Sequence, residues 1–335
     1  MVTFSLCMIV KNEEKVLKRC LDSISSIMDE IIIVDTGSSD GTRQIAAGYT
    51  DKIYDFEWID DFAAARNFAF SKATCDYIYS ADADEYMDAG NLEKFRALKE
   101  NILPEVEIVQ MYYVNQLGQD SVYNFDRELR AKLFKRVRNF TWIDPVHENI
   151  RELPVVYDSD IEIEHLPVSG HSGRDIGIFE KITGKGKSLS PRLNGMYARE
   201  LMISGTDEEI IRAEDYFTDL VNDDLTGPEN LKDAVCIVVR AAYIRGDALK
   251  MYHYALKEVA MEPASEVCYY LGRYYMDNND LKEATVWFYN AAFETESALS
   301  IKHGGKYPLL KLSECFELLG DKKTAENYRK QAEDA

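Results

Sequence analysis

Two aspartates, one residue apart, follow directly after a run of apolar and aromatic residues that begins at Tyr77. They are Asp82 and Asp84, and Glu85 comes next. A buried strand that ends in Asp-x-Asp places oxygen ligands at the carboxyl edge of a sheet, where they can hold a divalent cation. The cation can in turn hold phosphate oxygens, and Mn²⁺ or Mg²⁺ suits such ligands. We therefore expect a site for Mn²⁺ or Mg²⁺ at this strand end.

A second aspartate comes at the end of another apolar run. Asp35 follows Glu30–Val34 and precedes the turn Thr36–Gly41. A carboxylate in this place can accept hydrogen bonds from a base or a ribose. The alternative is that Asp35 only caps the following turn, as Asp often does. Because two strands deliver aspartates to one edge, we favour a nucleotide site.

Arg66 is the third candidate, one turn into an expected helix that begins after an acidic pair. It can reach a phosphate group, or it can form an ion pair with Asp61 or Asp84. Both roles can hold together, because an arginine often bridges a carboxylate and a phosphate.

Histidines and a glutamate supply the remaining candidates. His147 and Glu148 are adjacent and form a candidate acid–base pair, with Asp144 shortly before them. His165 ends a strand-like run and His171 lies beyond it. Either histidine can complete a metal site through a neutral imidazole, although a lone histidine is more often structural.

The first part of the chain alternates between strand-like and helix-like patterns. This alternation is typical of an α/β fold with a mostly parallel sheet and helices on both faces. Residues 120–168 read as short strands of an antiparallel flank or lid, and residues 169–190 as a flexible loop or linker rich in Gly, Ser and Lys. We expect strands at 4–10, 31–34, 52–56, 76–80 and 107–113, and helices at 13–27, 42–48, 62–72 and 91–101.

Beyond about residue 190 the strand pattern gives way to helical pairs with an internal repeat. The best copy resembles the tetratricopeptide pattern, in which small residues let two helices approach and aromatic residues fill the gap. An irregular helical bundle is the alternative. We expect a first domain at 1–187 and an all-helical second domain at 188–335. The residues of the best copy are Leu271, Gly272, Tyr275, Ala284, Phe288 and Ala291.

Composition excludes several classes of protein. The 335 residues are 46% hydrophobic, which suits packed cores, and carry a formal net charge of −20, which disfavours nucleic acid and anionic membranes. Six cysteines are scattered without a Cys-x-x-Cys motif, so we expect reduced thiols and a cytoplasmic protein. The apolar run Phe4–Val10 is too short for a signal sequence or a membrane span, and we expect no membrane insertion.

Five ordered motifs together resemble the family-two glycosyltransferases of the GT-A fold. The order and spacing are similar to the branch with an attached tetratricopeptide-like domain, which includes peptide S-glycosyltransferases of the sublancin type. The resemblance covers residues 1–150 and extends loosely into the helical half. The motifs are Ser5–Glu14, Ile33–Thr42, Trp58–Asn67, Ala81–Glu85 and Val146–Glu148.

This resemblance implies a nucleotide-sugar donor, most plainly a uridine diphosphate sugar. It implies Asp84 as the more direct metal ligand, with Asp82 and His165 completing the metal site. It implies Glu148 as the catalytic base with Asp144 as its substitute, and His147 beside them. The usual His-x-Gly-Tyr is replaced here by His165 and the three residues after it. The residues expected at the donor are Val10, Asn12, Glu13, Asp35, Arg66, Asp82 and Ala83.

The expected reaction is an inverting glycosyl transfer to a peptide, a protein or a glycan. A nucleotidyltransferase is a second hypothesis, but it predicts a glycine-rich loop after the first strand, where Lys11–Glu14 contains no glycine. A third hypothesis is a binding scaffold that uses its helical repeats while the catalytic half is weak or inactive. The helices offer a surface for an acceptor or for pairing of two copies.

Overall fold

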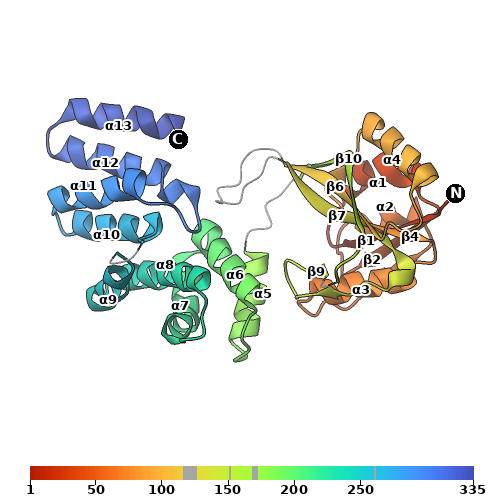
Figure 1. Ribbon diagram of the computed structural model, residues 1–335, viewed down its shortest axis with the longest axis horizontal. Helices are drawn as coiled ribbons and strands as arrows, with labels where there is room; N and C mark the ends of the chain where they lie inside the picture. Colours follow the sequence, from red (N-terminus) through yellow and green to blue (C-terminus); the bar gives the residue numbers. More distant parts are fainter. Residues whose placement is uncertain (116–126, 151, 168–172, 260–261) are drawn as a thin grey trace. The chain divides into compact units, whose positions relative to one another are not determined.

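The computed structural model describes residues 1–115, 127–150, 152–167, 173–259 and 262–335 (Figure 1). These residues divide into two compact units, one formed by the described residues up to 167 and one by those from 173. The first contains all the strands of the larger sheet, and the second is helical. Each unit is described by itself.

The first unit is built on a sheet of eight described strands in the order β3-β2-β1-β4-β7-β6-β10-β5. Strands β3, β2, β1 and β4 are parallel, β7 is antiparallel to both of its neighbours, and β10 runs parallel to β6. The expected mostly parallel sheet with an antiparallel flank is therefore confirmed. The strands are β1 (Phe4–Val10), β2 (Glu30–Asp35), β3 (Ile53–Asp55), β4 (Tyr77–Ala81), β5 (Glu85–Tyr86), β6 (Ile108–Asn115), β7 (Arg127–Lys135) and β10 (Val156–His165), and β8 (Trp142–Ile143) pairs with β9 (Asn149–Ile150) outside this sheet.

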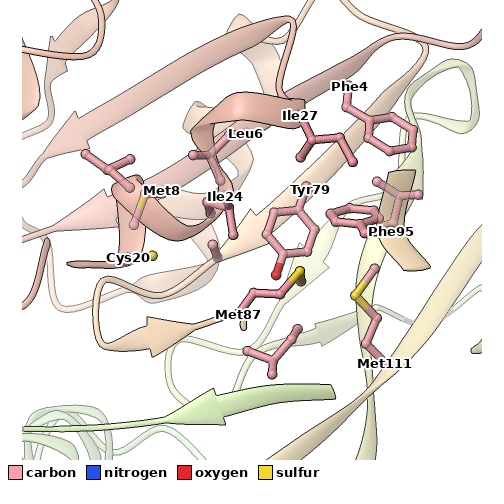
Figure 2. Close-up of a cluster of buried hydrophobic side chains, with 14 of the residues drawn as sticks. Phe4, Leu6, Met8, Cys20, Ile24, Ile27, Tyr79, Met87, Phe95 and Met111 are labelled. Carbon is pink, nitrogen blue, oxygen red and sulfur yellow. The ribbon is translucent and has the colours of Figure 1, made fainter. Parts of the chain in front are cut away.

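Helices cover both faces of the sheet, and Figure 1 shows α4 and α3 on opposite sides of it. Alternate residues of β1 face opposite ways: Leu6 packs in a core that includes residues of α1 and α4, whereas Cys7 packs in a core that includes α3. Figure 2 shows the first of these cores, where the rings of Tyr79 and Phe95 lie 5.2 Å apart. The helices are α1 (Leu17–Ile24), α2 (Thr42–Ala47), α3 (Phe62–Lys72) and α4 (Ala89–Asn101).

The strand register brings the predicted acidic residues to one edge. Val10, the last residue of β1, is paired with Asp35, the last residue of β2. On the other side of β1, Met8 is paired with Ala81, so Asp82 follows at about the level of the β1 end. The carboxyl ends of three adjacent parallel strands therefore meet, which is where α/β sheets bind ligands.

A buried carboxylate at the opposite end of β2 ties the sheet to its neighbours. Glu30 accepts hydrogen bonds from the Ser5 hydroxyl, from the Thr74 backbone N–H at 2.8 Å and from Lys52 Nζ at 2.6 Å. Burial raises the pKa of Glu30, but these hydrogen bonds outweigh burial and lower the pKa from 4.5 to about 2.

Replacing Glu30 with Gln should therefore change the acid stability of the protein. A carboxyl group with a lowered folded pKa stabilises the fold above its unfolded pKa, and this contribution disappears as the pH falls towards 2. We expect Glu30→Gln to reduce the free energy of unfolding by about 3 kcal/mol at pH 7, with a weaker pH dependence between pH 5 and pH 2. Denaturant titrations across this range, with the exposed Asp51→Asn as control, would measure both. If the free energy of unfolding of the variant depends on pH between pH 5 and pH 2 as that of the unaltered protein does, the role of Glu30 is contradicted.

The second unit consists of helical pairs, which confirms the predicted helical C-terminal region. Thr206 begins α7 with a reciprocal capping box to Glu209, and Gly246 ends α8 in the left-handed conformation. Figure 1 shows α10 beside α11 and α12 beside α13. The helices are α5 (Arg174–Thr183), α6 (Pro191–Ser204), α7 (Asp207–Asn222), α8 (Pro228–Arg245), α9 (Ala248–Val259), α10 (Ser265–Asp277), α11 (Leu281–Tyr289), α12 (Lys306–Leu318) and α13 (Lys322–Asp334).

The prediction of a loop or linker over 169–190 was wrong for α5. This helix buries Ile176, Ile178 and Phe179 and packs with α6 and α7 in the second unit. The glycines and lysines that flank these apolar residues concealed the helical pattern. Residues 168–172, which include His171, lie outside the described residues.

The repeat residues pack as the tetratricopeptide-like pattern requires. A Cβ atom added to Gly272 of α10 would lie 2.7 Å from ring atoms of Phe288 in α11, and Phe288 is fully buried. Glycine at this position lets the two helices approach, and the aromatic ring fills the space between them. Ala284 and Ala291 are fully buried too.

Adding that methyl group should destabilise the helical unit. We expect Gly272→Ala to lower the free energy of unfolding by about 1–3 kcal/mol, because the buried ring has to move. Gly177→Ala is the matched control: Gly177 lies in α5 with open space around its Cβ position, so alanine should be neutral or stabilise by up to about 1 kcal/mol. Equal melting temperatures for the two variants would contradict the close approach at Gly272.

All six cysteines are free thiols, and Cys75 alone among them is not fully buried. The helices in the described parts of the chain are too short or too polar to cross a bilayer.

Candidate active site

The loops after β1 and β2 are joined by hydrogen bonds around Asp35. The Asp35 carboxylate is buried, and its Oδ1 accepts the backbone N–H of Ser38 at 3.0 Å. The backbone N–H of Asn12 donates to the Ser38 hydroxyl at 3.0 Å, and Asn12 Oδ1 accepts the N–H of Ser39 at 2.8 Å. Asp35 therefore does cap its turn, and its contact with a nucleotide stays a prediction.

Two further predicted donor residues belong to the same loops. The Val10 carbonyl accepts the N–H of Thr36 at 3.0 Å, which joins the end of β1 to the end of β2. The N–H of Glu13 donates to the Thr42 hydroxyl at 2.7 Å, at the first residue of α2. These bonds fix the backbone on which the expected nucleotide site depends.

The Asp-x-Asp segment forms a turn and does not continue β4. The N–H of Glu85 donates to the Asp82 carbonyl at 3.2 Å. Because the chain turns here, the two aspartates leave in different directions: the Asp82 side chain is 46% exposed and that of Asp84 is 12% exposed. Ala83 between them is buried.

Asp84 contacts the predicted late histidine. His165 Nε2 lies 3.0 Å from Asp84 Oδ2, and the N–H of Leu166 donates to the Asp84 carbonyl at 2.9 Å. Two ligands at adjacent positions of an octahedral ion with bonds of about 2.1 Å lie about 3.0 Å apart. The carboxylate oxygen and imidazole nitrogen therefore fit Mn²⁺ or Mg²⁺ as a pair of ligands.

The predicted set of three metal ligands does not converge. Within the described ranges, no group of three or more His, Cys, Asp or Glu side chains is placed to hold a metal ion. Asp82 is turned towards Arg66, while Asp84 is turned towards His165. The sequence pattern predicts an extended strand end at these residues. The chain instead turns at Asp82, and this turn separates the two carboxylates.

Arg66 is the centre of the second half of the site. Its Nε and Nη2 donate to Glu148 Oε1 at 2.8 and 2.5 Å, its Nη1 donates to the Ser80 hydroxyl at 2.6 Å, and Nη2 lies 3.5 Å from Asp82 Oδ1. The guanidinium also lies over the Trp142 ring, 4.9 Å from its centre. Arg66 thus connects the predicted base to the Asp-x-Asp turn.

The ion-pair partners predicted for Arg66 were wrong. Arg66 forms its ion pairs with Glu148 and Asp82, whereas Asp61 and Asp84 were the expected partners. Asp61 instead caps α3, where its carboxylate accepts the N–H of Ala64 at 2.8 Å. Glu148 is far from Arg66 in sequence, and spacing along the chain does not indicate such a contact.

The segment that carries Glu148 is held on α3. Asn67 exchanges two hydrogen bonds of 2.8 Å with the backbone of Trp142, and the N–H of Phe62 donates to the Pro145 carbonyl at 2.8 Å. Asp144 and His147 adopt positive φ angles of 72° and 50°. Such strained residues are frequent in functional loops, because the surrounding structure has to hold them in place.

Burial and neighbouring charges shift the pKa values of Asp82 and Glu85 in opposite directions. Partial burial raises the pKa of the Asp82 carboxyl, whose side chain is 46% exposed, but the positive charges of Arg66, Lys132 and Arg130 outweigh it and lower the pKa to about 2. Burial raises the pKa of Glu85 to about 7, although Lys132 opposes the rise. Asp82 is therefore held as a carboxylate beside the site.

Sequence reasoning missed the buried pair beneath the turn. Lys132 Nζ of β7 lies 2.6 Å from Glu85 Oε1, and both side chains are nearly inaccessible. Removing one partner of a buried pair leaves an uncompensated charge, so both are needed for the turn to keep its place. The one signal in the sequence is a lysine within a strand-like run, between Ala131 and Leu133.

Part of the chain is similar in sequence to known glycosyltransferases. Residues 5–152 match the family model of glycosyl transferase family 2. A TPR repeat-containing protein from Synechococcus elongatus is 36% identical over 148 residues, which cover 44% of this chain and 35% of that protein. The SPbeta prophage-derived glycosyltransferase SunS of Bacillus subtilis is 26% identical over 238 residues, which cover 66% of this chain and 53% of SunS.

The chain thus spans about a third to a half of these relatives. A solved structure of glucosyl-3-phosphoglycerate synthase from Mycobacterium tuberculosis, in complex with Mn²⁺, uridine diphosphate and phosphoglyceric acid, is 14% identical. The superposition covers 57% of this chain and 81% of the synthase chain, with a TM-score of 0.42. We base no argument about fold or ligand on this likeness. The matched range includes Asp35, Asp82 and Glu148 and ends before His165. The chain is therefore similar to glycosyl transferase family 2 over residues 5–152, and its described residues from 173 onward form a helical region.

Proposed function

We propose that this protein transfers a sugar from a uridine diphosphate sugar to an acceptor, with inversion at the anomeric carbon. The observation that carries the proposal is the pair of contacts at one sheet edge, Glu148 with Arg66 and Asp84 with His165. In this proposal Glu148 serves as the base, and Asp84 and His165 serve as metal ligands.

Asp84 and His165 would hold Mn²⁺ or Mg²⁺, with the remaining ligands supplied by phosphate oxygens and water. A bound cation of this kind offsets the negative charge that develops on the departing diphosphate. Asp35 and the loop around Asn12 would bind the uridine, because they lie at the ends of the neighbouring strands β2 and β1.

Glu148 is the proposed general base. Both contacts from Arg66 fall on Oε1, which leaves Oε2 to take the proton from the acceptor nucleophile as it attacks the anomeric carbon. Arg66 orients the carboxylate. A single displacement inverts the anomeric carbon, so no covalent intermediate with the enzyme is required. Asp144, in the same strained loop, is the substitute base.

The proposed acceptor is a peptide, a protein or a glycan. The helical unit offers an extended surface of stacked helices for it, as helical repeats commonly do. The alignment with SunS covers 66% of this chain, which is more than the range 5–152 matched by the family model. The similarity to SunS therefore extends into part of the helical unit.

A panel of nucleotide sugars tests this function. The purified protein is incubated with Mn²⁺ and each uridine, guanosine or cytidine diphosphate sugar, with and without cell extract, and the products are analysed by mass spectrometry. We expect release of uridine diphosphate and a mass increase of one sugar on an acceptor. Release of pyrophosphate in a parallel reaction supplied with uridine triphosphate and a sugar 1-phosphate would indicate a nucleotidyltransferase instead, and no turnover in either reaction would favour a binding scaffold.

A further inference from the structure

One arginine contacts both of the segments that carry the proposed metal ligands. Arg19, on α1, donates through Nη2 to the Leu166 carbonyl at 2.5 Å and to the Asp84 carbonyl at 3.4 Å. Leu166 directly follows His165, and its own N–H donates to the Asp84 carbonyl at 2.9 Å. These hydrogen bonds close a ring of three residues beside the proposed metal ligands.

The sheet alone gives these two ligands little support. Asp84 directly precedes β5, which is two residues long and lies at the edge of the sheet. The pairing of β5 with β10 joins Glu164 to Tyr86 and His165 to Glu85. A short edge strand makes few hydrogen bonds and opens more readily than the centre of a sheet. The distance between Asp84 and His165 therefore depends on contacts from outside the sheet.

Helix α1 is a firm base for such contacts. Its apolar face is buried in the first core, where Figure 2 shows Cys20. Cys20 Sγ lies 3.4 Å from the Asp82 carbonyl, and the N–H of Met87 donates to the Ser23 hydroxyl at 3.3 Å. Helix α1 thus holds the chain before and after the proposed ligand on the turn, and Arg19 adds the connection to the end of β10.

We propose that Arg19 is a positioning residue for the metal site, which sets the affinity for Mn²⁺ by holding Asp84 and His165 at the distance of two neighbouring ligands. This inference rests on the proposed function. A guanidinium is rigid and planar, so it can fix two carbonyl oxygens in one geometry. Residues that orient metal ligands without touching the metal commonly change metal affinity by about 10- to 100-fold when they are replaced.

The charge of Arg19 separates positioning from simple electrostatics. Arg19 donates to backbone carbonyls and forms no ion pair with any residue that the structure describes. Its positive charge by itself disfavours a cation beside Asp84. A neutral side chain at this position would therefore tighten Mn²⁺ binding if charge dominated, and would weaken it if positioning dominated.

Water-proton relaxation measures Mn²⁺ binding to full-length Arg19→Met, with Lys18→Met as the matched control. Lys18 precedes Arg19 on α1, and its side chain is 66% exposed and pairs with Asp22. We expect the dissociation constant for Mn²⁺ to rise at least about ten-fold in Arg19→Met and to stay at the unaltered value in Lys18→Met. Equal or tighter binding by Arg19→Met would overturn the proposal.

Transfer rates supply a second measurement. At saturating Mn²⁺ the kcat of Arg19→Met should return close to that of the unaltered protein, because both proposed ligands are still present. Asp84→Ala should not recover in this way. A kcat of Arg19→Met that stays low at saturating Mn²⁺ would contradict a role confined to metal affinity.

The metal-free protein distinguishes failure of this inference from failure of the proposed function. Hydrogen–deuterium exchange with mass spectrometry follows the N–H of Leu166, which is bound to the Asp84 carbonyl. We expect exchange about five-fold faster in Arg19→Met than in Lys18→Met. Equal exchange would overturn the positioning role. Faster exchange, together with an unaltered protein that binds no Mn²⁺, would support the positioning of these segments and contradict the metal-assisted transfer.

Discussion

Asp84→Ala is expected to reduce sugar transfer and donor hydrolysis by at least about 100-fold. The substitution removes the carboxylate of the Asp84–His165 pair, and the charge stabilisation supplied by a catalytic metal is several kcal/mol. Excess Mn²⁺ should not restore the rate, because one of the two protein ligands is gone. Release of uridine diphosphate, followed at increasing Mn²⁺ concentrations, measures the effect.

The control for this variant is Asp51→Ala, which removes an exposed aspartate of the same unit. It should keep full activity. Both variants should unfold at similar temperatures, because among the described residues the Asp84 side chain makes one polar contact, to His165. Full activity of Asp84→Ala would show that the metal site has been assigned to the wrong residues.

Glu148→Gln is expected to lower kcat by about 10²- to 10⁴-fold, the usual contribution of a general base. The amide oxygen can still accept the hydrogen bonds from Arg66, so the loop and the Asp82 turn should keep their positions. Donor binding should therefore change little, and the loss should appear in kcat and not in the affinity for uridine diphosphate. Steady-state kinetics together with calorimetric titration separate the two quantities.

The matched comparison for Glu148 is Asp144→Asn in the same loop. If Glu148 is the base, Asp144→Asn should retain most of the activity. A large loss in Asp144→Asn with an active Glu148→Gln would move the role to Asp144. Activity of both variants would refute a carboxylate base in this loop.

The sequence was sufficient for the architecture because local patterns determine it. The apolar run of β1, the strand that ends at Asp35 and the helix at 62–72 each have a period or a boundary that can be read locally, and the structure has α3 at Phe62–Lys72. The close packing of Gly272 against Phe288 could be predicted for the same reason, since one repeat contains both residues.

Local sequence patterns do not predict contacts between segments that are distant along the chain. The pairing of Arg66 with Glu148 joins residues 82 positions apart, and no spacing rule indicates it. The turn at Asp82 was missed because an acidic strand end and an acidic turn have the same composition. The Lys132–Glu85 pair joins β7 to β5, and local patterns do not indicate it because charged residues in strands are normally exposed.

The central claim is that acidic residues at the carboxyl edge of the sheet bind a nucleotide through a divalent cation. Calorimetric titration of the unaltered protein with uridine diphosphate, with Mn²⁺ and then with a chelator in its place, tests it most directly. We predict saturable binding with Mn²⁺ that weakens at least ten-fold with the chelator and in Asp84→Ala. Binding of equal strength under all three conditions, or none with Mn²⁺ present, would contradict the account.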